Sequence, residues 1–382
     1  MVYFDNAATT YPKPQSIQFA VSDAVKSYGG NPGRSGHRVS MRVSEKVFEV
    51  RQKVAAFFDA EPENVVFTVN CTHALNMAIK GVMEGGGHII TSCLEHNSVL
   101  RPIYAMHEAG KVTYSVADVF EDGDRTLAVF TDLIRPDTKA IVCTYASNVS
   151  GTVLPIRKLS ALCKQYGLVF IVDAAQAAGM LPVHVKEMGI DILCTAGHKG
   201  LYGATGTGLM ILNEGAKLAT LIEGGTGSNS LELAQPDFMP DRFESGTLNT
   251  VGILSLGAGL DFVAHRGIND IYRYEMALCA RVYNEMKQMP HVDLLTQSFR
   301  LGEKVPIISF NIKGVDSMAV TENLSRKGYM LRGGFHCAAL AHRYFGTEEQ
   351  GAVRFSPGHF NKPQQINAFL SEIKKIQKNG LL

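Results

Sequence analysis

The stretch from Leu168 to Gly208, LVFIVDAAQAAGMLPVHVKEMGIDILCTAGHKGLYGATGTG, decides the fold of this chain. It holds two short apolar runs: Leu168–Val172 ends on Asp173, and Ile190–Cys194 is followed closely by Lys199. Short apolar runs bounded by polar and glycine residues indicate buried parallel strands. Ligands bind beyond the carboxyl ends of the strands in such sheets. We therefore predict that Asp173 and Lys199 share one crevice.

An amine and a carboxylate in one crevice are what pyridoxal phosphate (PLP) requires: a Schiff-base lysine and a partner for its protonated ring nitrogen. Lys199 follows a buried strand among glycines, where desolvation favours the reactive neutral amine. Gln176 could reach the ring hydroxyl, and His198 could donate to the phosphate. Two other interpretations stay open, because Asp173 could simply cap a helix and His198 could bond to backbone.

The composition indicates an ordinary globular protein of 382 residues, 46% apolar and 19% charged, for which two domains are the natural expectation. A net charge of +1 favours neither nucleic acid nor a membrane surface as a partner. No apolar run approaches the length of a membrane span, and the start lacks the pattern of a secretory signal. The seven cysteines are scattered and form no CxxC pair, which predicts reduced thiols and a cytoplasmic location.

Strands that alternate with helices over residues 60–215 predict a doubly wound, mostly parallel sheet, and the pattern from Val292 onward predicts a smaller α+β domain. Cys71-Thr72 opens a helix directly after a strand, which is either an anion site or an ordinary threonine cap. Residues 222–249 are polar and aperiodic, which indicates a functional or interface segment. The expected strands are 65–69, 88–92, 140–146, 168–172, 190–194, 306–312, 329–332 and 352–356. The expected helices are 15–27, 156–166, 250–265, 269–288, 317–327 and 363–377, with two more that begin near Val39 and Cys71.

Nine segments, in this order, resemble the cysteine desulfurase and selenocysteine lyase family of the class V aminotransferase group, which are fold-type I PLP enzymes. The segments are DNAATT at 5–10, CTHALN at 71–76, LEHNSVL at 94–100, SNVSG at 147–151, DAAQAAG at 173–179, AGHKGLYG at 196–203, FESGTLN at 243–249, RGGFHCA at 332–338 and VRFSPGHFN at 353–361.

The resemblance implies an α/β, PLP-dependent transferase-like fold with a mostly parallel, seven-stranded sheet in the large domain. We expect an N-terminal extended segment at 1–14 that packs with the small domain, a large PLP-binding domain at 15–255, and a small α+β domain at 256–382. The small domain would carry Cys337 and Arg354.

The resemblance also implies a role for each matching residue. Lys199 would form the Schiff base, Asp173 would face the pyridine nitrogen, and Gln176 would lie near the ring oxygen. His96 would stack on the ring and move protons, and the phosphate would be held by Thr72, the His73 backbone and His198. The substrate would be bound by Asn148 and Arg354, because a guanidinium matches a carboxylate with two bonds. Thr247 would reach the cofactor of a second subunit, which implies a homodimer.

Cys337 differs from the other six cysteines in its surroundings. It lies in LRGGFHC, where glycines expose the backbone and two neighbours can be cationic. Such surroundings favour a thiolate. In the family, the matching cysteine attacks the sulfur of the substrate and keeps it as a persulfide.

Three features depart from the family pattern. Ala196 stands three residues before the lysine, where relatives commonly carry a serine or threonine that bonds the phosphate, and Thr195 cannot be assumed to replace it. Gly200 is one extra residue beside the lysine, and the segment after Cys337 lacks the usual proline. His336 and His342 could suggest a metal, but no third ligand accompanies them at usable spacing, so we expect none.

The function that we predict is a PLP-dependent cysteine desulfurase, which turns L-cysteine into L-alanine and a persulfide on Cys337, with L-selenocysteine as a second candidate substrate. A sulfur-acceptor protein would then be a partner. One alternative is a class V aminotransferase or a C–S lyase on another amino acid. The other alternative is a non-catalytic sulfur scaffold, but such a protein would not need the pocket around Lys199.

Overall fold

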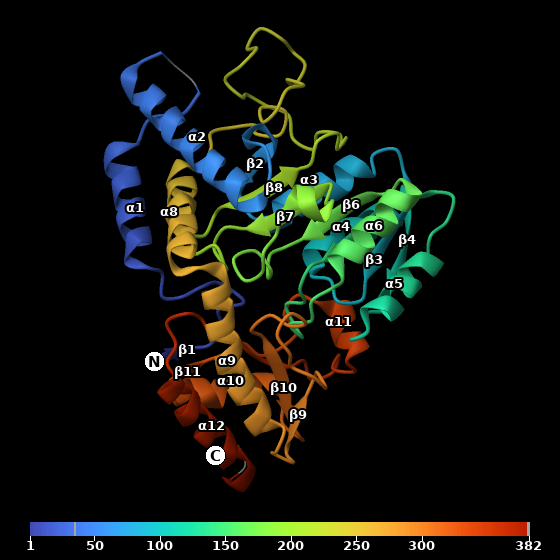
Figure 1. Cartoon of the computed structure of the whole chain (residues 1–382), viewed down its shortest axis with the longest axis vertical. Coiled ribbons are helices and arrows are strands. Elements are labelled where there is room, and N and C mark those ends of the chain that lie inside the picture. The colour runs from blue at the N-terminus through green and yellow to red at the C-terminus, as the bar shows by residue number, and fades with distance from the viewer. Residues whose placement is uncertain (34–35, 380–382) are drawn as a thin grey trace.

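The computed structural model describes residues 1–33 and 36–379, which form a large body around a seven-stranded sheet and a smaller one around a three-stranded sheet (Figure 1). The strand order in the large sheet is β2-β8-β7-β6-β5-β3-β4. Its strands are β2 Val65–Thr68, β3 Gly87–Ser92, β4 Val112–Ala117, β5 Thr138–Thr144, β6 Val169–Asp173, β7 Ile192–Ala196 and β8 Gly208–Leu212.

The large sheet is mixed. The pairs from β7 through β6, β5 and β3 to β4 are parallel, whereas β8 runs antiparallel to both β7 and β2. The predicted α/β fold with a mostly parallel, seven-stranded sheet is therefore confirmed. The helices of this body are α1 Gln15–Ser27, α2 Arg38–Phe58, α3 Cys71–Val82, α4 Asn97–Glu108, α5 Gly123–Asp132, α6 Ile156–Tyr166, α7 Val185–Met188 and α8 Thr250–Arg266, with the 3₁₀ turn η1 Pro62–Asn64.

Both faces of the sheet are buried, because alternate residues of each strand enter different cores. On β5, Ile141 packs with residues of α2, α6 and α8, while Val142 packs with residues of α3 and α4. Successive side chains on a strand point to opposite faces, so a strand covered by helices on both sides must be apolar throughout. This is why the deciding strands appear in the sequence as continuous apolar runs.

The small body contains the antiparallel sheet β12-β10-β9 and the N-terminal strand β1, which pairs in parallel with β11. Phe4 packs in its core among residues of β10, β12 and α12. These contacts join the N-terminal segment to the small body. The elements are β1 Val2–Tyr3, α9 Ile268–Met286, β9 Val292–Leu294, β10 Ile308–Ile312, α10 Ser317–Arg326, β11 Tyr329–Met330, α11 Ala339–Tyr344, β12 Val353–Phe355 and α12 Pro363–Asn379.

The position of helix α8 argues for a different domain boundary from the one that we expected at residues 255/256. This position lies inside α8, and Leu260, beyond it, still packs with the core of the large body. The first small-body residue of α9 that lies in the core around Phe4 is Leu278. We therefore propose that the domains divide near Gly267, where α8 ends and α9 begins.

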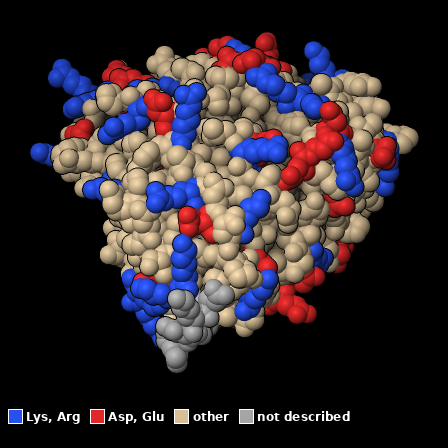
Figure 2. All heavy atoms as spheres, turned by 60° about the horizontal axis from the view of Figure 1, so that its bottom comes forward, with Lys and Arg blue, Asp and Glu red and all other residues tan. Residues whose placement is uncertain are grey.

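The segment 222–249 contains neither helix nor strand until α8 begins, as its composition predicts. It lies at the end of the molecule away from the small body (Figure 1). Leu231 and Leu233 are fully exposed there. On the face shown in Figure 2, basic and acidic side chains intermingle, in keeping with the net charge of +1.

No single helix among the described residues is long and apolar enough to cross a membrane. Helices α8 and α9 meet that test only when they are joined, and their axes differ by 79° at the break between them.

Two glycines let the loops after β6 and β7 touch. Gly179 has φ +81°, and a Cβ on it would lie 2.1 Å from the Gly200 carbonyl oxygen. A Cβ on Gly200 would lie 2.3 Å from the Ala178 carbonyl oxygen. The extra glycine beside Lys199 is therefore required by this close backbone approach.

We expect Gly179→Ala to lower the free energy of unfolding by about 2–3 kcal/mol, because it adds a backbone clash to an unfavourable φ. Gly167→Ala is the matched control, since Gly167 has φ +65° but open space around its Cα. That control should lose only about 1 kcal/mol. Urea denaturation measures both variants, and equal losses would show that the loop contact does not matter.

Candidate active site

The predicted crevice exists as a cavity of about 210 Å³ at the carboxyl ends of β5, β6 and β7. It lies where the large body, the small body and the N-terminal segment meet, since each of the three contributes to its wall. The residues that line it are Ala7, Ala8, Asn70, Cys71, Thr72, His96, Ser98, Thr144, Ala146, Asn148, Asp173, Ala175, Gln176, Ala196, His198, Lys199, Arg332, His336 and Arg354.

Asp173 and Lys199 face this cavity together, as predicted. Desolvation lowers the pKa of Lys199, although the Asp173 carboxylate opposes the shift. Asp173 is the last residue of β6, and its Oδ1 accepts from the Ala175 N–H at 2.9 Å and from the Cys71 thiol at 3.5 Å. The arrangement provides a lysine that loses its proton more readily than usual, opposite a fixed carboxylate.

The N-terminal segment braces the loop that carries Lys199. Thr10 Oγ1 donates to the Lys199 carbonyl oxygen at 2.8 Å, and Thr9 Oγ1 donates to that of His198 at 3.2 Å. Lys13 Nζ donates to the same His198 oxygen at 2.7 Å. Burial and the nearby Lys199 lower the pKa of His198 to about 4, so its ring is neutral, and its Nδ1 has no partner within residues 1–33 and 36–379.

Helix α3 points its N-terminus at the cavity. Asn70 caps the helix by accepting from the His73 N–H at 2.9 Å. The His73 backbone is therefore already bonded, and His73 does not line the cavity. Thr72, one residue earlier, does line it, and the first turn of a helix favours an anion.

His96 is held at the N-terminus of α4. Its Nδ1 accepts from the Ser98 N–H at 3.0 Å, and burial lowers its pKa to about 4. The imidazole is therefore neutral with its proton on Nε2. The turn before it is fixed by Glu95, a buried residue that accepts from the Thr144 N–H at 2.8 Å.

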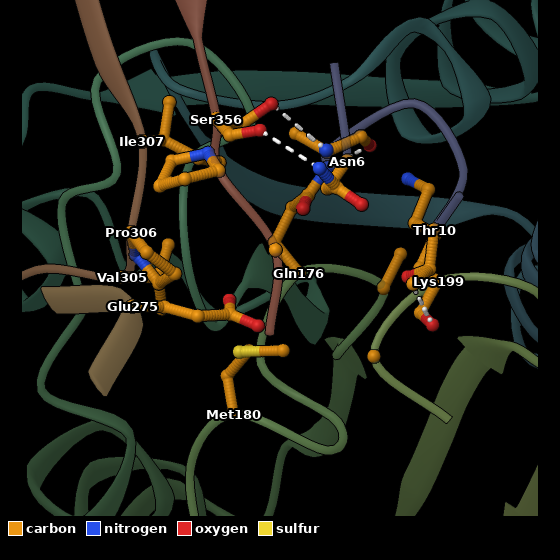
Figure 3. Close-up of a pocket in the computed structure, with 15 residues that line it drawn as sticks. Asn6, Thr10, Gln176, Met180, Lys199, Glu275, Val305, Pro306, Ile307 and Ser356 are labelled. Atoms are coloured by element: carbon orange, nitrogen blue, oxygen red, sulfur yellow. Dashed lines mark hydrogen bonds between the residues drawn. The ribbon is translucent and has the colours of Figure 1, made fainter. Parts of the chain in front are cut away.

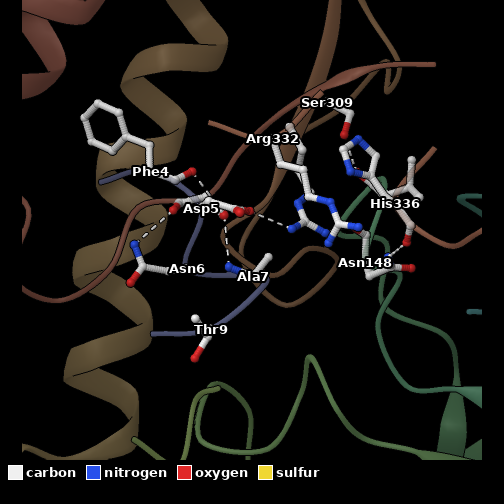
Figure 4. A network of polar contacts seen from close by, with 12 residues as sticks. Phe4, Asp5, Asn6, Ala7, Thr9, Asn148, Ser309, Arg332 and His336 are labelled. Carbon is white, nitrogen blue, oxygen red and sulfur yellow. Dashed lines mark hydrogen bonds and ion pairs between the residues drawn. The ribbon is translucent and has the colours of Figure 1, made fainter. Parts of the chain in front are cut away.

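Arg354 joins the small body to the N-terminal segment through a polar network that includes Asp5 and Asn148, both of which are labelled in Figure 4. Its Nη2 donates to Asp5 at 2.7 Å and its Nη1 to the Asn148 carbonyl oxygen at 3.1 Å, whereas its Nε has no partner. Asn148 donates its amide to the His336 carbonyl oxygen at 2.8 Å and leaves its own Oδ1 unpartnered. Among the residues that the structure describes, neither Arg354 Nε nor Asn148 Oδ1 finds a partner, and both residues line the cavity.

Cys337 does not line the cavity but lies at its rim. Its carbonyl oxygen accepts from the Asn97 N–H at 2.7 Å, and its Sγ lies 3.9 Å from Arg332 Nη2. His336 and Cys337 both have positive φ, 48° and 55°, a strained conformation for residues with a side chain. This strained conformation places the exposed Cys337 thiol beside Arg332, and Arg332 does line the cavity.

Gln176 lines the main cavity and also a smaller one of about 30 Å³, which Figure 3 shows. Its Nε2 donates to the Ala7 carbonyl oxygen at 2.9 Å. Glu275 lines the small cavity, and burial raises its pKa to about 8, so it is mostly protonated at neutral pH.

The structure brings eight predicted site residues together around one cavity: Thr72, His96, Asn148, Asp173, Gln176, His198, Lys199 and Arg354. Three others lie elsewhere, namely His73, Cys337 and Thr247. Thr247 is exposed in the irregular segment, where its Oγ1 accepts from Asn31 at 3.3 Å.

Sequence reasoning assigned no role to Asp5, Ser98 or Arg332. Asp5 lies in the first quoted motif, but nothing local shows that it meets Arg354 from 349 positions away. Ser98 lies two residues after His96, and Arg332 five residues before Cys337. The departure at Ala196 also stands, because Ala196 lines the cavity and the Thr195 hydroxyl bonds instead to the Ala174 carbonyl oxygen at 3.3 Å.

No group of three or more His, Cys, Asp or Glu side chains within the described part of the chain is arranged to hold a metal. His336 and His342 lie with ring centroids 5.7 Å apart.

Comparison with known proteins adds independent information. The family model described as Aminotransferase class-V matches residues 2–369. A protein named probable cysteine desulfurase from Methanothermobacter thermautotrophicus is 29% identical, over 99% of this chain and 95% of the relative. The apo structure of a cysteine desulfurase from Thermococcus onnurineus is 30% identical with a TM-score of 0.91, over 99% of this chain and 94% of that one. A cysteine desulfurase structure from Escherichia coli, at 24% identity, has a TM-score of 0.87 over 98% and 94% of the two chains, which shows a shared fold.

Proposed function

This chain belongs to the aminotransferase class-V family, and from that premise we propose that it is a PLP-dependent cysteine desulfurase that uses Cys337 as sulfur acceptor. The observation that carries the proposal is the shared cavity of Lys199, Asp173 and Arg354, with the exposed Cys337 at its rim. The relatives named cysteine desulfurase, which match this chain nearly end to end, support the choice of reaction.

The residues of the cavity fit PLP. A lysine with a lowered pKa and a carboxylate lie opposite each other, and His198 has a free ring nitrogen beside them. Lys199 would hold the aldehyde carbon, Asp173 the ring nitrogen, and Thr72 with His198 the phosphate. When bound, PLP supplies an electron sink for the carbon atoms of an amino-acid substrate.

Arg354 and Asn148 would bind the amino-acid part of the substrate. The unpartnered Nε of Arg354 is a buried donor, and a carboxylate would satisfy it. Asp5 holds Nη2 and fixes the plane of the guanidinium. Lys199, once the substrate amine has displaced it, would move protons at the substrate carbons. The neutral His96 would keep its Nε2 proton directed at the ring face.

The sulfur would leave toward Cys337. Its thiolate attacks the substrate sulfur, so that an S–S bond forms while the bond between the sulfur and Cβ breaks. Cβ gains a proton and is reduced, which yields alanine, and the two sulfurs are oxidised to a persulfide. The thiolate is the attacking form, and Arg332 Nη2, 3.9 Å from Sγ, would stabilise it.

The direct test is to incubate the purified holoprotein with L-cysteine, to quantify alanine, and to analyse Cys337 by mass spectrometry. We expect alanine and one added sulfur atom on Cys337. A keto acid without alanine would show an aminotransferase instead. If neither product forms and cysteine does not change the cofactor band, the proposal is refuted.

Arg354→Lys should raise KM for cysteine by about 10- to 100-fold with a smaller change in kcat, because an ammonium cannot replace the guanidinium fork. Steady-state kinetics measures this effect. Arg300→Lys, at an arginine that is mostly exposed on the surface, is the control. An unchanged KM would remove Arg354 from the substrate site.

L-selenocysteine is a second candidate substrate on the same site. The ratio of kcat/KM for the two amino acids decides which one the enzyme prefers. A ratio near one would mean that the cavity recognises only the amino-acid part of the substrate and does not distinguish sulfur from selenium.

We also propose a homodimer in which Thr247 reaches the cofactor of the partner. The support is the exposure of Thr247 and of the leucines at 231 and 233 in the same segment. A reducing compartment such as the cytoplasm is supported by the seven free cysteines, and a sulfur-acceptor protein would take the persulfide from the exposed thiol. Sedimentation of the wild type tests the dimer, and a monomer that is fully active would exclude it.

A further inference from the structure

Two hydroxyl groups meet at the wall of the cavity. Thr72 Oγ1 and Ser98 Oγ lie 2.7 Å apart, and both residues line the cavity with Ala196 and His198. Thr72 belongs to the first turn of α3 and Ser98 to the first turn of α4. Ser98 is buried, at 7% exposure, so its hydroxyl is not a solvated surface group.

The two hydroxyl groups of this pair carry two protons, one of which an anion in the cavity can accept. Only one proton can lie between two hydroxyl oxygens, so the other O–H must point elsewhere. Ser98 Oγ also lies 2.7 Å from His96 Nδ1, but that nitrogen already accepts from the Ser98 backbone N–H. The two hydroxyls can therefore form a chain in which Thr72 donates to Ser98 and Ser98 donates to His96 Nδ1. Because Nδ1 also keeps the backbone N–H, an anion in the cavity can compete for the Ser98 proton.

The surroundings favour an anion as that acceptor. Both helices have twelve residues and direct the positive ends of their dipoles to this corner. Lys199 lines the same cavity, and so does Asp173, whose Oδ1 already accepts from the Ala175 N–H and the Cys71 thiol. Ala196 and Thr195 supply no hydroxyl to the cavity, since the first has none and the second bonds to Ala174.

We propose that the hydroxyl of Ser98 binds the phosphate of PLP together with Thr72, and so provides the hydroxyl donor that Ala196 lacks. This inference rests on the proposed function only as far as PLP binding. It assigns a phosphate contact to a residue of the α4 turn that also presents His96. The anchor of the phosphate and the histidine at the ring face are then neighbours on one turn.

The test measures cofactor binding in the absence of cysteine. Apoprotein is titrated with PLP by equilibrium dialysis and by the absorbance of the Schiff base. Ser98→Ala should weaken PLP binding about 10- to 100-fold, as expected for the loss of a hydrogen bond to a charged group. Ser98→Thr keeps the hydroxyl and should bind within about threefold of wild type.

Pyridoxal, which has the same ring and aldehyde but no phosphate, is the discriminating probe. If Ser98 acts on the phosphate, Ser98→Ala and wild type should bind pyridoxal equally well. If Ser98 acts only by positioning His96 or by stabilising the α4 turn, the variant should lose affinity for pyridoxal as well, and the inference is overturned.

A second variant moves the hydroxyl to the other side of the cavity. Ala196→Ser in the Ser98→Ala background should recover at least about half of the lost PLP affinity on a logarithmic scale, without a change for pyridoxal. Equal PLP affinity of Ser98→Ala and wild type would refute the role of Ser98 while PLP binding itself stands. A wild-type protein that binds no PLP would refute the proposed function and this inference together.

Discussion

Cys337→Ala should form alanine from L-cysteine at least about 10³-fold more slowly than wild type, while its cofactor band stays unchanged. The loss is large because removing a nucleophile removes the reaction path, and not only a part of the binding energy. Cys337 lies outside the cavity, so PLP should bind normally. An amine should still enter the site and shift the cofactor spectrum.

Cys163→Ala is the matched control for this prediction. Cys163 is a buried thiol on α6, in the core of the large body and away from the cavity. It should keep the rate of wild type after correction for folded protein. If Cys337→Ala and Cys163→Ala release alanine equally well, another group accepts the sulfur, and the role of Cys337 is wrong.

Lys199→Ala should eliminate the Schiff-base absorbance and lower alanine formation by about 10⁴-fold or more. One side chain carries two functions here, the covalent hold on the cofactor and the transfer of protons at the substrate carbons. Borohydride treatment followed by mass spectrometry should attach PLP to Lys199 in wild type and to no lysine of the cavity in the variant. Lys53→Ala, at an exposed lysine on α2, should behave as wild type.

The pH dependence of Schiff-base formation gives a further readout on Lys199. A lowered pKa means that the neutral amine appears at lower pH than in an ordinary lysine, whose pKa is 10.5. The rate of formation with apoprotein should therefore rise with pH and reach half its maximum below pH 10.5. A midpoint at or above that value would contradict the desolvation of the amine.

The core of the site could be predicted from sequence because its signals are local. Strands buried on both faces appear as continuous apolar runs in the sequence. Asp173 lies at the end of one such run, and Lys199 follows shortly after another. Strand β4 was missed because its central residues are half exposed and alternate weakly. Strand β8 was not among the expected strands, and its antiparallel direction was not predictable, because an apolar pentamer looks the same in a parallel or an antiparallel pair.

The contacts that join distant segments could not be predicted in the same way. Asn70 takes the His73 N–H that the resemblance assigns to a phosphate, and only the cap geometry shows it. The hydroxyl pair of Thr72 and Ser98 joins two helix ends that are separated by a strand. Such contacts depend on how helices dock on the sheet, which no periodicity encodes.

The distribution of the seven thiols has a practical consequence. Burial raises the pKa of six of them, Cys71, Cys93, Cys143, Cys163, Cys194 and Cys279, whereas Cys337 alone among the described residues is an exposed cysteine. A thiol reagent added to the native protein should therefore titrate Cys337 selectively. It should consume one equivalent per chain before unfolding and seven after unfolding. Our proposal that Cys337 accepts the sulfur therefore implies transfer to another molecule, because the other six cysteines in the described part of the chain are buried.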